Sequence, residues 1–213
     1  MKRFLCYLVL TVTVIQLFSQ ESKLSIGIGI TPSMTKIRGF SLYDLQDPKF
    51  SVAPGLYVEY NYSSKITFLT GIEYETKGVK SETTVRDNKG LEIGDGMSKY
   101  IFEYLSIPIL ASLKTKGKVS FYGEGGLFIG YLLSMKYVLT TDYLDEKYTE
   151  DNTDGFRKLD VGLSAGFGIE TSLSEKLNLN IGLRDNLGLL STSDYASIRT
   201  NSLGLLVRVK YNL

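Results

Sequence analysis

The feature that most constrains the fold is a strict alternation of apolar residues with small or polar ones. It is clearest in segment 23–33. There the apolar set is Leu24, Ile26, Ile28 and Ile30, and the polar set is Ser25, Gly27, Gly29 and Thr31. Residues two apart share one face of a β-strand, whereas an α-helix cannot sustain a period of two. The alternation therefore predicts strands that have one apolar face and one polar face.

Eight segments are predicted as strands: 23–33, 51–62, 65–78, 100–114, 118–136, 158–172, 176–190 and 201–213. Short connections lie around Ser63-Ser64, Lys116-Gly117 and Ser174-Glu175, and longer ones span 34–50, 79–99, 137–157 and 191–200. Short and long connections alternate in the same way in outer-membrane barrels, because their short turns face the periplasm and their long loops face outside. We expect an all-β fold, an eight-stranded antiparallel up-and-down transmembrane β-barrel over residues 20–213, with both ends of the barrel domain on the periplasmic side.

The first residues predict an export signal. Lys2 and Arg3 precede an apolar run from Phe4 to Phe18, and a small polar segment follows. This order is typical of a secretory signal peptide, which we place at residues 1–19. An uncleaved membrane anchor is the alternative, but the run is short for a full span. The single cysteine, Cys6, lies within this segment, too early for a lipidated cysteine.

The apolar faces are expected to point outward into lipid and the polar faces into the lumen. Aromatic residues near the strand ends support this orientation, because tyrosine favours the boundary between hydrocarbon and water. They are Tyr60, Tyr62, Phe121 and Tyr211 near the short turns, and Tyr74 and Tyr131 near the long loops. A secreted soluble barrel of the lipocalin kind would have the opposite orientation. The sequence lacks the early Gly-x-Trp of that family and contains no Trp.

The inward faces carry many charges. The candidate functional residues are a lumen charge network of Glu59, Glu73, Glu124, Glu170, Arg184, Arg208 and Lys210. Glu75, Lys77 and Asp160 lie on the same faces. Eight strands enclose a space that side chains can just fill, so paired charges are expected to plug the lumen. A narrow ion path or a small-ligand site is the alternative.

The composition argues against catalysis. The chain contains no histidine, which excludes Ser-His-Asp and Cys-His sites and histidine metal sites. Its 24 basic and 23 acidic residues create no basic field for nucleic acid. The acidic stretch 142–155 lacks EF-hand spacing and is expected to be a solvated loop. We expect neither an enzyme nor a cofactor or metal.

The sequence from residue 20 onward resembles the PorT-like outer-membrane β-barrel domain family. The matching stretches are Lys23–Gly29, Thr70–Gly78, Tyr104–Leu110 with its central Ile-Pro, and Asp160–Glu170. The resemblance implies an eight-stranded outer-membrane barrel. Some members of the family take part in an outer-membrane secretion machine, and the family supplies no catalytic motif.

The sequence leaves two functions open. The first is a structural or partner-interaction role in the bacterial outer membrane, as an accessory to an envelope or secretion complex. Its partners would be outer-membrane lipid and envelope proteins, which would bind through the loops or the periplasmic rim. The second is a narrow pore or small-ligand-binding barrel that uses the charged lumen. The sequence specifies neither a partner nor an oligomeric state.

Overall fold

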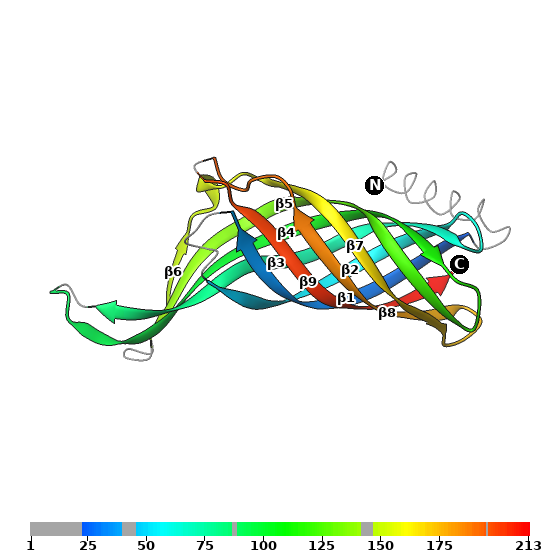
Figure 1. Ribbon diagram of the computed structural model, residues 1–213, viewed down its shortest axis with the longest axis horizontal. Helices are drawn as coiled ribbons and strands as arrows, with labels where there is room; N and C mark the ends of the chain where they lie inside the picture. Colours follow the sequence, from blue (N-terminus) through cyan, green and yellow to red (C-terminus); the bar gives the residue numbers. More distant parts are fainter. Residues whose placement is uncertain (1–22, 40–45, 87–88, 142–146, 195) are drawn as a thin grey trace, which may run out of the picture.

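The strands curl into a closed barrel with a long sheet projecting from one end (Figure 1). The computed structural model describes residues 23–39, 46–86, 89–141, 147–194 and 196–213, so the predicted signal peptide at 1–19 lies outside the described residues. The strands are β1 (Leu24–Arg38), β2 (Asp47–Asn61), β3 (Ile66–Arg86), β4 (Glu92–Lys114), β5 (Val119–Thr141), β6 (Lys147–Asp151), β7 (Leu159–Ser172), β8 (Leu177–Gly188) and β9 (Arg199–Asn212). One 3₁₀ turn, η1 (Thr153–Gly155), follows β6.

Eight of these strands form the ring. Each pairs antiparallel with its neighbour in the order β4-β3-β2-β1-β9-β8-β7-β5, and β4 pairs with β5 to close it. Within the ring, the first strand along the chain, β1, pairs with the last, β9. Next to this pair, the amide of Leu213 donates a hydrogen bond to the carbonyl of Leu24 at 3.1 Å. The expected eight-stranded up-and-down barrel is confirmed. The short strand β6 is additional and pairs only with β5.

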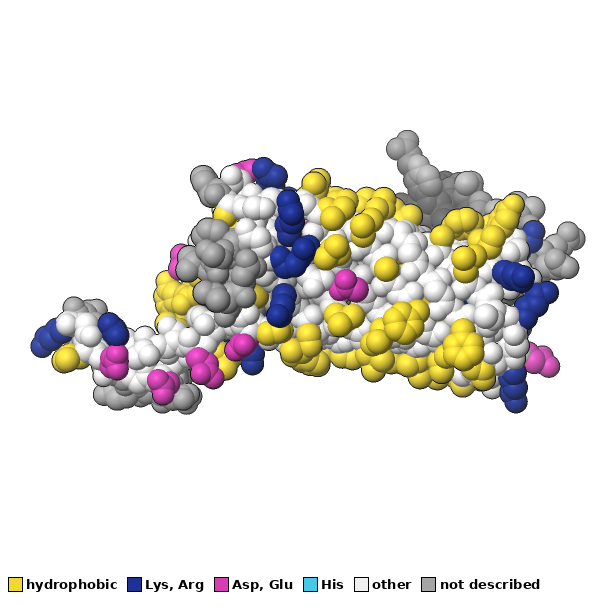
Figure 2. Space-filling view, viewed as in Figure 1, with side chains coloured by type: hydrophobic (Ala, Val, Ile, Leu, Met, Phe, Trp, Pro, Cys, Tyr) yellow, Lys and Arg dark blue, Asp and Glu magenta, His cyan; other side chains and the backbone are white. Residues whose placement is uncertain are grey.

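The two faces are oriented as the alternation predicts. Ile26, Leu56 and Leu163 are 48%, 64% and 47% exposed, whereas Glu124 and Arg184 are 6% and 3% exposed. Apolar side chains therefore cover the outer wall and polar ones fill the interior, which rules out a lipocalin-like core. On the face drawn in Figure 2, an apolar belt lies between two charged borders. This arrangement suits a barrel whose wall contacts hydrocarbon.

Three of the four long connections are shorter than predicted, because the strands continue through them. β1 and β2 extend into 34–50, and β3 and β4 extend into 79–99 as far as the pair Arg86–Glu92. β5 continues into 137–157, which also contains β6 and η1. The prediction that these three segments are loops over their whole length was therefore wrong. The paired residues of β3, β4, β5 and β6 beyond the ring form a sheet that we call the arm.

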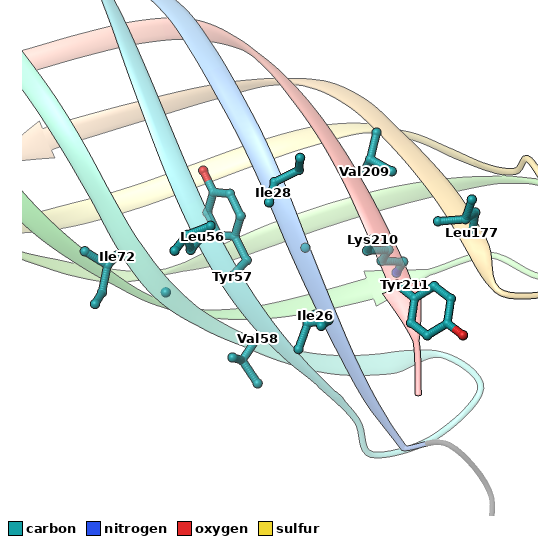
Figure 3. Close-up of a pocket in the computed structure, with 12 residues that line it drawn as sticks. Ile26, Ile28, Leu56, Tyr57, Val58, Ile72, Leu177, Val209, Lys210 and Tyr211 are labelled. Carbon is teal, nitrogen blue, oxygen red and sulfur yellow. The ribbon is translucent and has the colours of Figure 1, made fainter. Parts of the chain in front are cut away.

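The outer wall also holds a shallow apolar hollow of about 540 Å³. It lies over Gly27 and Gly71, which carry no side chain, and Ile28, Val58 and Val209 lie around it (Figure 3). Lys210 borders it, but the Lys210 ammonium points into the lumen toward Glu59. The hollow is therefore part of the apolar wall and presents no charged group. Within the described residues, no helix has the length and hydropathy needed to cross a membrane.

Candidate functional site

The lumen brings together all seven residues of the predicted charge network. Every one of them is at least partly buried and has an oppositely charged side chain within ion-pair distance. Each lies on the inward face of its strand, because its sequence neighbours occupy the outward, apolar face. The contacts form three groups along the barrel axis.

The first group lies nearest the short turns. The Lys210 ammonium is 2.8 Å from Glu59 Oε2 and 2.6 Å from Glu170 Oε2. Lys114 reaches Glu170 Oε2 at 3.2 Å, and the Asn180 amide donates to the same oxygen at 3.1 Å. Two lysines thus neutralise two carboxylates drawn from strands on opposite sides of the ring.

The second group contains the two arginines. Arg184 meets Glu73 at 2.5 Å across 111 residues of sequence. Arg208 lies between Glu59, at 3.4 Å from its Nε, and Glu124, at 3.5 Å from an NH₂ nitrogen. The Arg208 guanidinium also lies 5.0 Å from the ring centre of Tyr57. An ion pair therefore holds Arg184 in the middle of the barrel, and ion pairs together with a cation–π contact hold Arg208 there.

The third group is centred on Lys77, which is completely buried. Its ammonium lies 3.0 Å from Asp160 Oδ2 and 3.4 Å from Glu75 Oε2, and 4.2 Å from the ring centre of Phe128. Hydroxyl groups also donate hydrogen bonds to these carboxylates. The Thr200 hydroxyl donates to Asp160 at 2.6 Å, and the Ser202 hydroxyl donates to Glu75 at 2.8 Å. Lys77, Asp160 and Glu75 are thus both ion-paired and hydrogen-bonded, which a buried charge requires.

An apolar cluster closes the lumen beyond Lys77, at the long-loop end. Its buried members are Ile37, Val79, Phe102, Tyr104, Leu132, Met135 and Ile198. Phe156 packs against Phe102 edge-on with ring centres 5.1 Å apart. Apart from the Tyr104 hydroxyl, the buried side chains of this cluster offer no polar group to water or ions. We call it the apolar seal.

The opposite mouth is polar and open. A hollow of about 1030 Å³ lies at the short-turn end, lined among others by Lys23, Asn61, Lys114 and Glu170. Lys114 and Glu170 retain 12% and 15% side-chain exposure, whereas Arg208 and Glu124 deeper in the lumen retain 2% and 1%. The lumen is therefore a vestibule that narrows into packed charges and ends at the apolar seal.

The sequence analysis missed two parts of this site. Lys114 was not assigned to the inward face, although it continues the inward row of Leu110 and Ser112 on β4. The apolar seal was missed because Ile37, Val79 and Ile198 fell in segments predicted as loops.

The described residues contain no cluster of three or more histidine, cysteine or acidic side chains suited to a metal ion. In the acidic stretch 142–155, Asp142, Asp145 and Glu146 lie outside the described residues, and β6 replaces part of the expected solvated loop. Just beyond β6, Thr153 donates from its hydroxyl and its amide to Asp151 Oδ1, at 2.6 and 3.0 Å. These hydrogen bonds hold the pKa of the exposed Asp151 below its ordinary value.

Comparisons with known proteins agree with the geometry. The sequence profile of the outer membrane protein beta-barrel domain matches residues 18–194. A comparison with curated proteins gives no match.

The chain is also similar to several solved structures. Neisserial surface protein A is 12% identical, with 90% of this chain and 97% of that chain covered and a TM-score of 0.49. The attachment invasion locus protein Ail of Yersinia pestis is 12% identical, with 88% and 98% covered and a TM-score of 0.39. OprG of Pseudomonas aeruginosa is 11% identical, with 90% and 96% covered and a TM-score of 0.38.

The family assignment rests on the sequence profile, which covers most of the chain, and on the closed ring with its apolar belt. The chain belongs to the outer membrane protein β-barrel domain family, and it lies in the bacterial outer membrane in contact with lipid.

Proposed function

We propose that this protein is a non-conducting, non-catalytic barrel that anchors the arm in the outer membrane and presents it to an envelope protein. The observation that carries the proposal is the arm itself. β3 continues to pair with β4 beyond Lys80, the last β3 residue that pairs with β2. The register holds as far as Val85 and shifts before the last pair, Arg86–Glu92. The sheet therefore continues outside the lipid-facing ring, where lipid contact does not require it.

The arm has the features of a recognition surface. Residues Ser81–Arg86 pair with β4 on one side, and β6 is the last strand of the sheet on the other side. Exposed sheet edges pair readily with an extended segment of another chain. A polar hollow of about 800 Å³ lies on the arm between Glu82, Thr84, Asp95 and Lys99. These features favour a polar protein segment that adds to the sheet.

An accessory role in an envelope or secretion complex, implied by the resemblance to the PorT-like family, fits this proposal. The missing histidine argues against catalysis. The filled lumen argues against transport, because Arg208, Lys77, Phe102 and Phe128 are completely buried within it.

Shortening the arm tests the proposed interaction. Residues 81–98 are replaced by Asn-Gly, so that a two-residue turn closes the hairpin after the pair Lys80–Lys99. The ring is expected to fold as in the wild type, with the same shift in gel mobility on heating. A photo-crosslinking residue at Thr84 of the full-length protein is expected to capture one envelope protein in intact cells.

The same envelope protein should co-purify with the full-length protein and be lost from the shortened variant. The control position is Ile72, which is 51% exposed on the lipid-facing wall and should give no protein adduct. An arm that captures no protein, or a partner that is retained by the shortened variant, contradicts the proposal.

Electrical recording tests the narrow-pore alternative. The purified barrel in a planar bilayer is expected to pass no current above background, because the apolar seal blocks the lumen. A variant with Phe102→Ser and Met135→Ser provides the contrast, since it replaces two large members of the seal. Stable channels in the wild type would show that the lumen conducts and would favour the pore.

A further inference from the structure

A cluster of polar residues interrupts the outer wall at the long-loop end of β8, β9 and β1. On β1, exposed Ile26, Ile28, Ile30 and Met34 lead on the same outward row to Lys36 and Arg38. On β9, exposed Leu205 and Leu203 lead to Asn201 and Arg199. Figure 2 shows Lys and Arg side chains gathered along this border of the apolar belt. Both rows thus change from apolar to basic where hydrocarbon gives way to headgroups.

The register places like charges side by side. Arg38 is directly opposite Arg199, and Lys36 is directly opposite Asn201. Side chains in such positions start about 5 Å apart, and like charges there destabilise a sheet. Among the described residues, no carboxylate lies within ion-pair distance of Lys36, Arg38 or Arg199. Arg38 donates a hydrogen bond to the carbonyl of Gly188 at 2.9 Å.

Two basic residues near this end show the contrast, because each has an acidic partner. Lys136 lies 3.3 Å from Glu103, and Arg157 lies 2.5 Å from Asp194. Lys36, Arg38 and Arg199 therefore form a patch of positive charge that has no acidic partner within the described part of the chain.

Asp185 places a carboxylate on the same wall. It lies on the outward row of β8, after Ile181 and Leu183, and is opposite Leu203 in the sheet. Its Oδ1 accepts a hydrogen bond from the Asn201 amide at 2.8 Å. A charged group on a lipid-facing row lowers the stability of the inserted barrel unless polar groups form hydrogen bonds or ion pairs with it. Asp185 and Asn201 thus extend the polar patch from the long-loop end toward the middle of the apolar belt.

We propose that these residues bind the phosphorylated sugar headgroup of a glycolipid in the outer leaflet. Lys36, Arg38 and Arg199 bind its phosphate, because arginine matches phosphate geometry in two-point contacts. Asp185 and Asn201 hydrogen-bond to its sugar hydroxyl or amide groups. The acyl chains lie along Met34 and Leu203 on the apolar rows below. A free anion would satisfy the three bases, but it would make no use of the second Asp185 oxygen or of the apolar rows below the patch.

Vesicles of defined composition test the proposal. The wild type and the Arg38→Gln/Arg199→Gln variant are folded into phosphatidylcholine vesicles, with and without a diphosphorylated glycolipid, and the heat-unfolding midpoint is read from gel mobility. Glycolipid is expected to raise the wild-type midpoint and to leave the midpoint of the variant unchanged. In native mass spectrometry, the variant should retain glycolipid at least about tenfold less, since it loses charge-assisted hydrogen bonds.

The matched control is Lys116→Gln/Lys118→Gln, which removes two positive charges from exposed residues at the opposite, short-turn end. It should respond to glycolipid as the wild type does. Asp185→Leu should raise the midpoint in plain phosphatidylcholine and reduce the gain from glycolipid.

Three results would overturn the assignment. The first is an undiminished response of the double arginine variant. The second is equal stabilisation of the wild type by the dephosphorylated glycolipid. The third is equal stabilisation by inorganic phosphate alone, which would indicate a general anion site rather than a lipid site.

Discussion

Lys77→Met is expected to destabilise the folded barrel by about 3–5 kcal/mol, the largest effect of any single substitution considered for this protein. The methionine fills a similar volume but carries no charge. Glu75 and Asp160 would then remain in the lumen without their shared cation, and their side chains are only 3% and 0% exposed. Water cannot replace the ammonium at that depth, because the apolar seal lies above it. The free energy of unfolding in urea, measured in lipid vesicles, provides the test.

Two variants separate the loss of pairing from a general effect of losing a lysine. Lys65→Met, at an exposed position in a short turn, should change the free energy of unfolding by less than about 0.5 kcal/mol. Lys77→Met combined with Asp160→Asn and Glu75→Gln should recover most of the loss, because no unpaired carboxylate remains. A Lys77→Met barrel as stable as the wild type would show that the three charges do not act as a buried unit.

Leu205→Arg is expected to destabilise the barrel by about 2–4 kcal/mol when the protein is folded in vesicles. Leu205 lies at the middle of β9, points outward and is 45% exposed. In water an exposed arginine there would cost almost nothing. In the bilayer the guanidinium must enter hydrocarbon or distort it. The measurement is again the free energy of unfolding in urea.

The control for this prediction lies on the arm. Tyr148→Arg replaces a side chain that is 57% exposed on β6, outside the ring, and should be close to neutral. If Leu205→Arg and Tyr148→Arg have equal effects, the wall around Leu205 does not contact lipid.

The sequence predicts the ring well because each ring strand separates two different environments. Hydrocarbon outside and packed charge inside impose opposite requirements on successive residues, so the alternation in β1, β7, β8 and β9 is nearly unbroken. The arm has no such constraint. Water surrounds it and main-chain hydrogen bonds hold it together, so its residues show no strong period and were predicted as loops.

The candidate site likewise has one part that the sequence predicts and one part that it does not. Which charges point inward follows from the period of two, and all seven members of the predicted network lie there. Which charges pair does not follow from local sequence. Glu73 meets Arg184 only because closure of the ring sets the stagger of strands 111 residues apart. The apolar seal depends on that stagger too, because it gathers Ile37, Val79 and Ile198 from the ends of different strands.

The contact between the first and last strands has a consequence for biogenesis. Without β9, β1 and β8 would each present a row of unpaired amide and carbonyl groups to hydrocarbon, at a cost of several kcal/mol per group. The Arg208 and Lys210 side chains would be missing from the lumen as well, leaving Glu59 and Glu124 unneutralised. A nascent chain that ends before residue 199 therefore has no stable inserted form. We therefore expect stable insertion into the membrane to require all fourteen residues of β9.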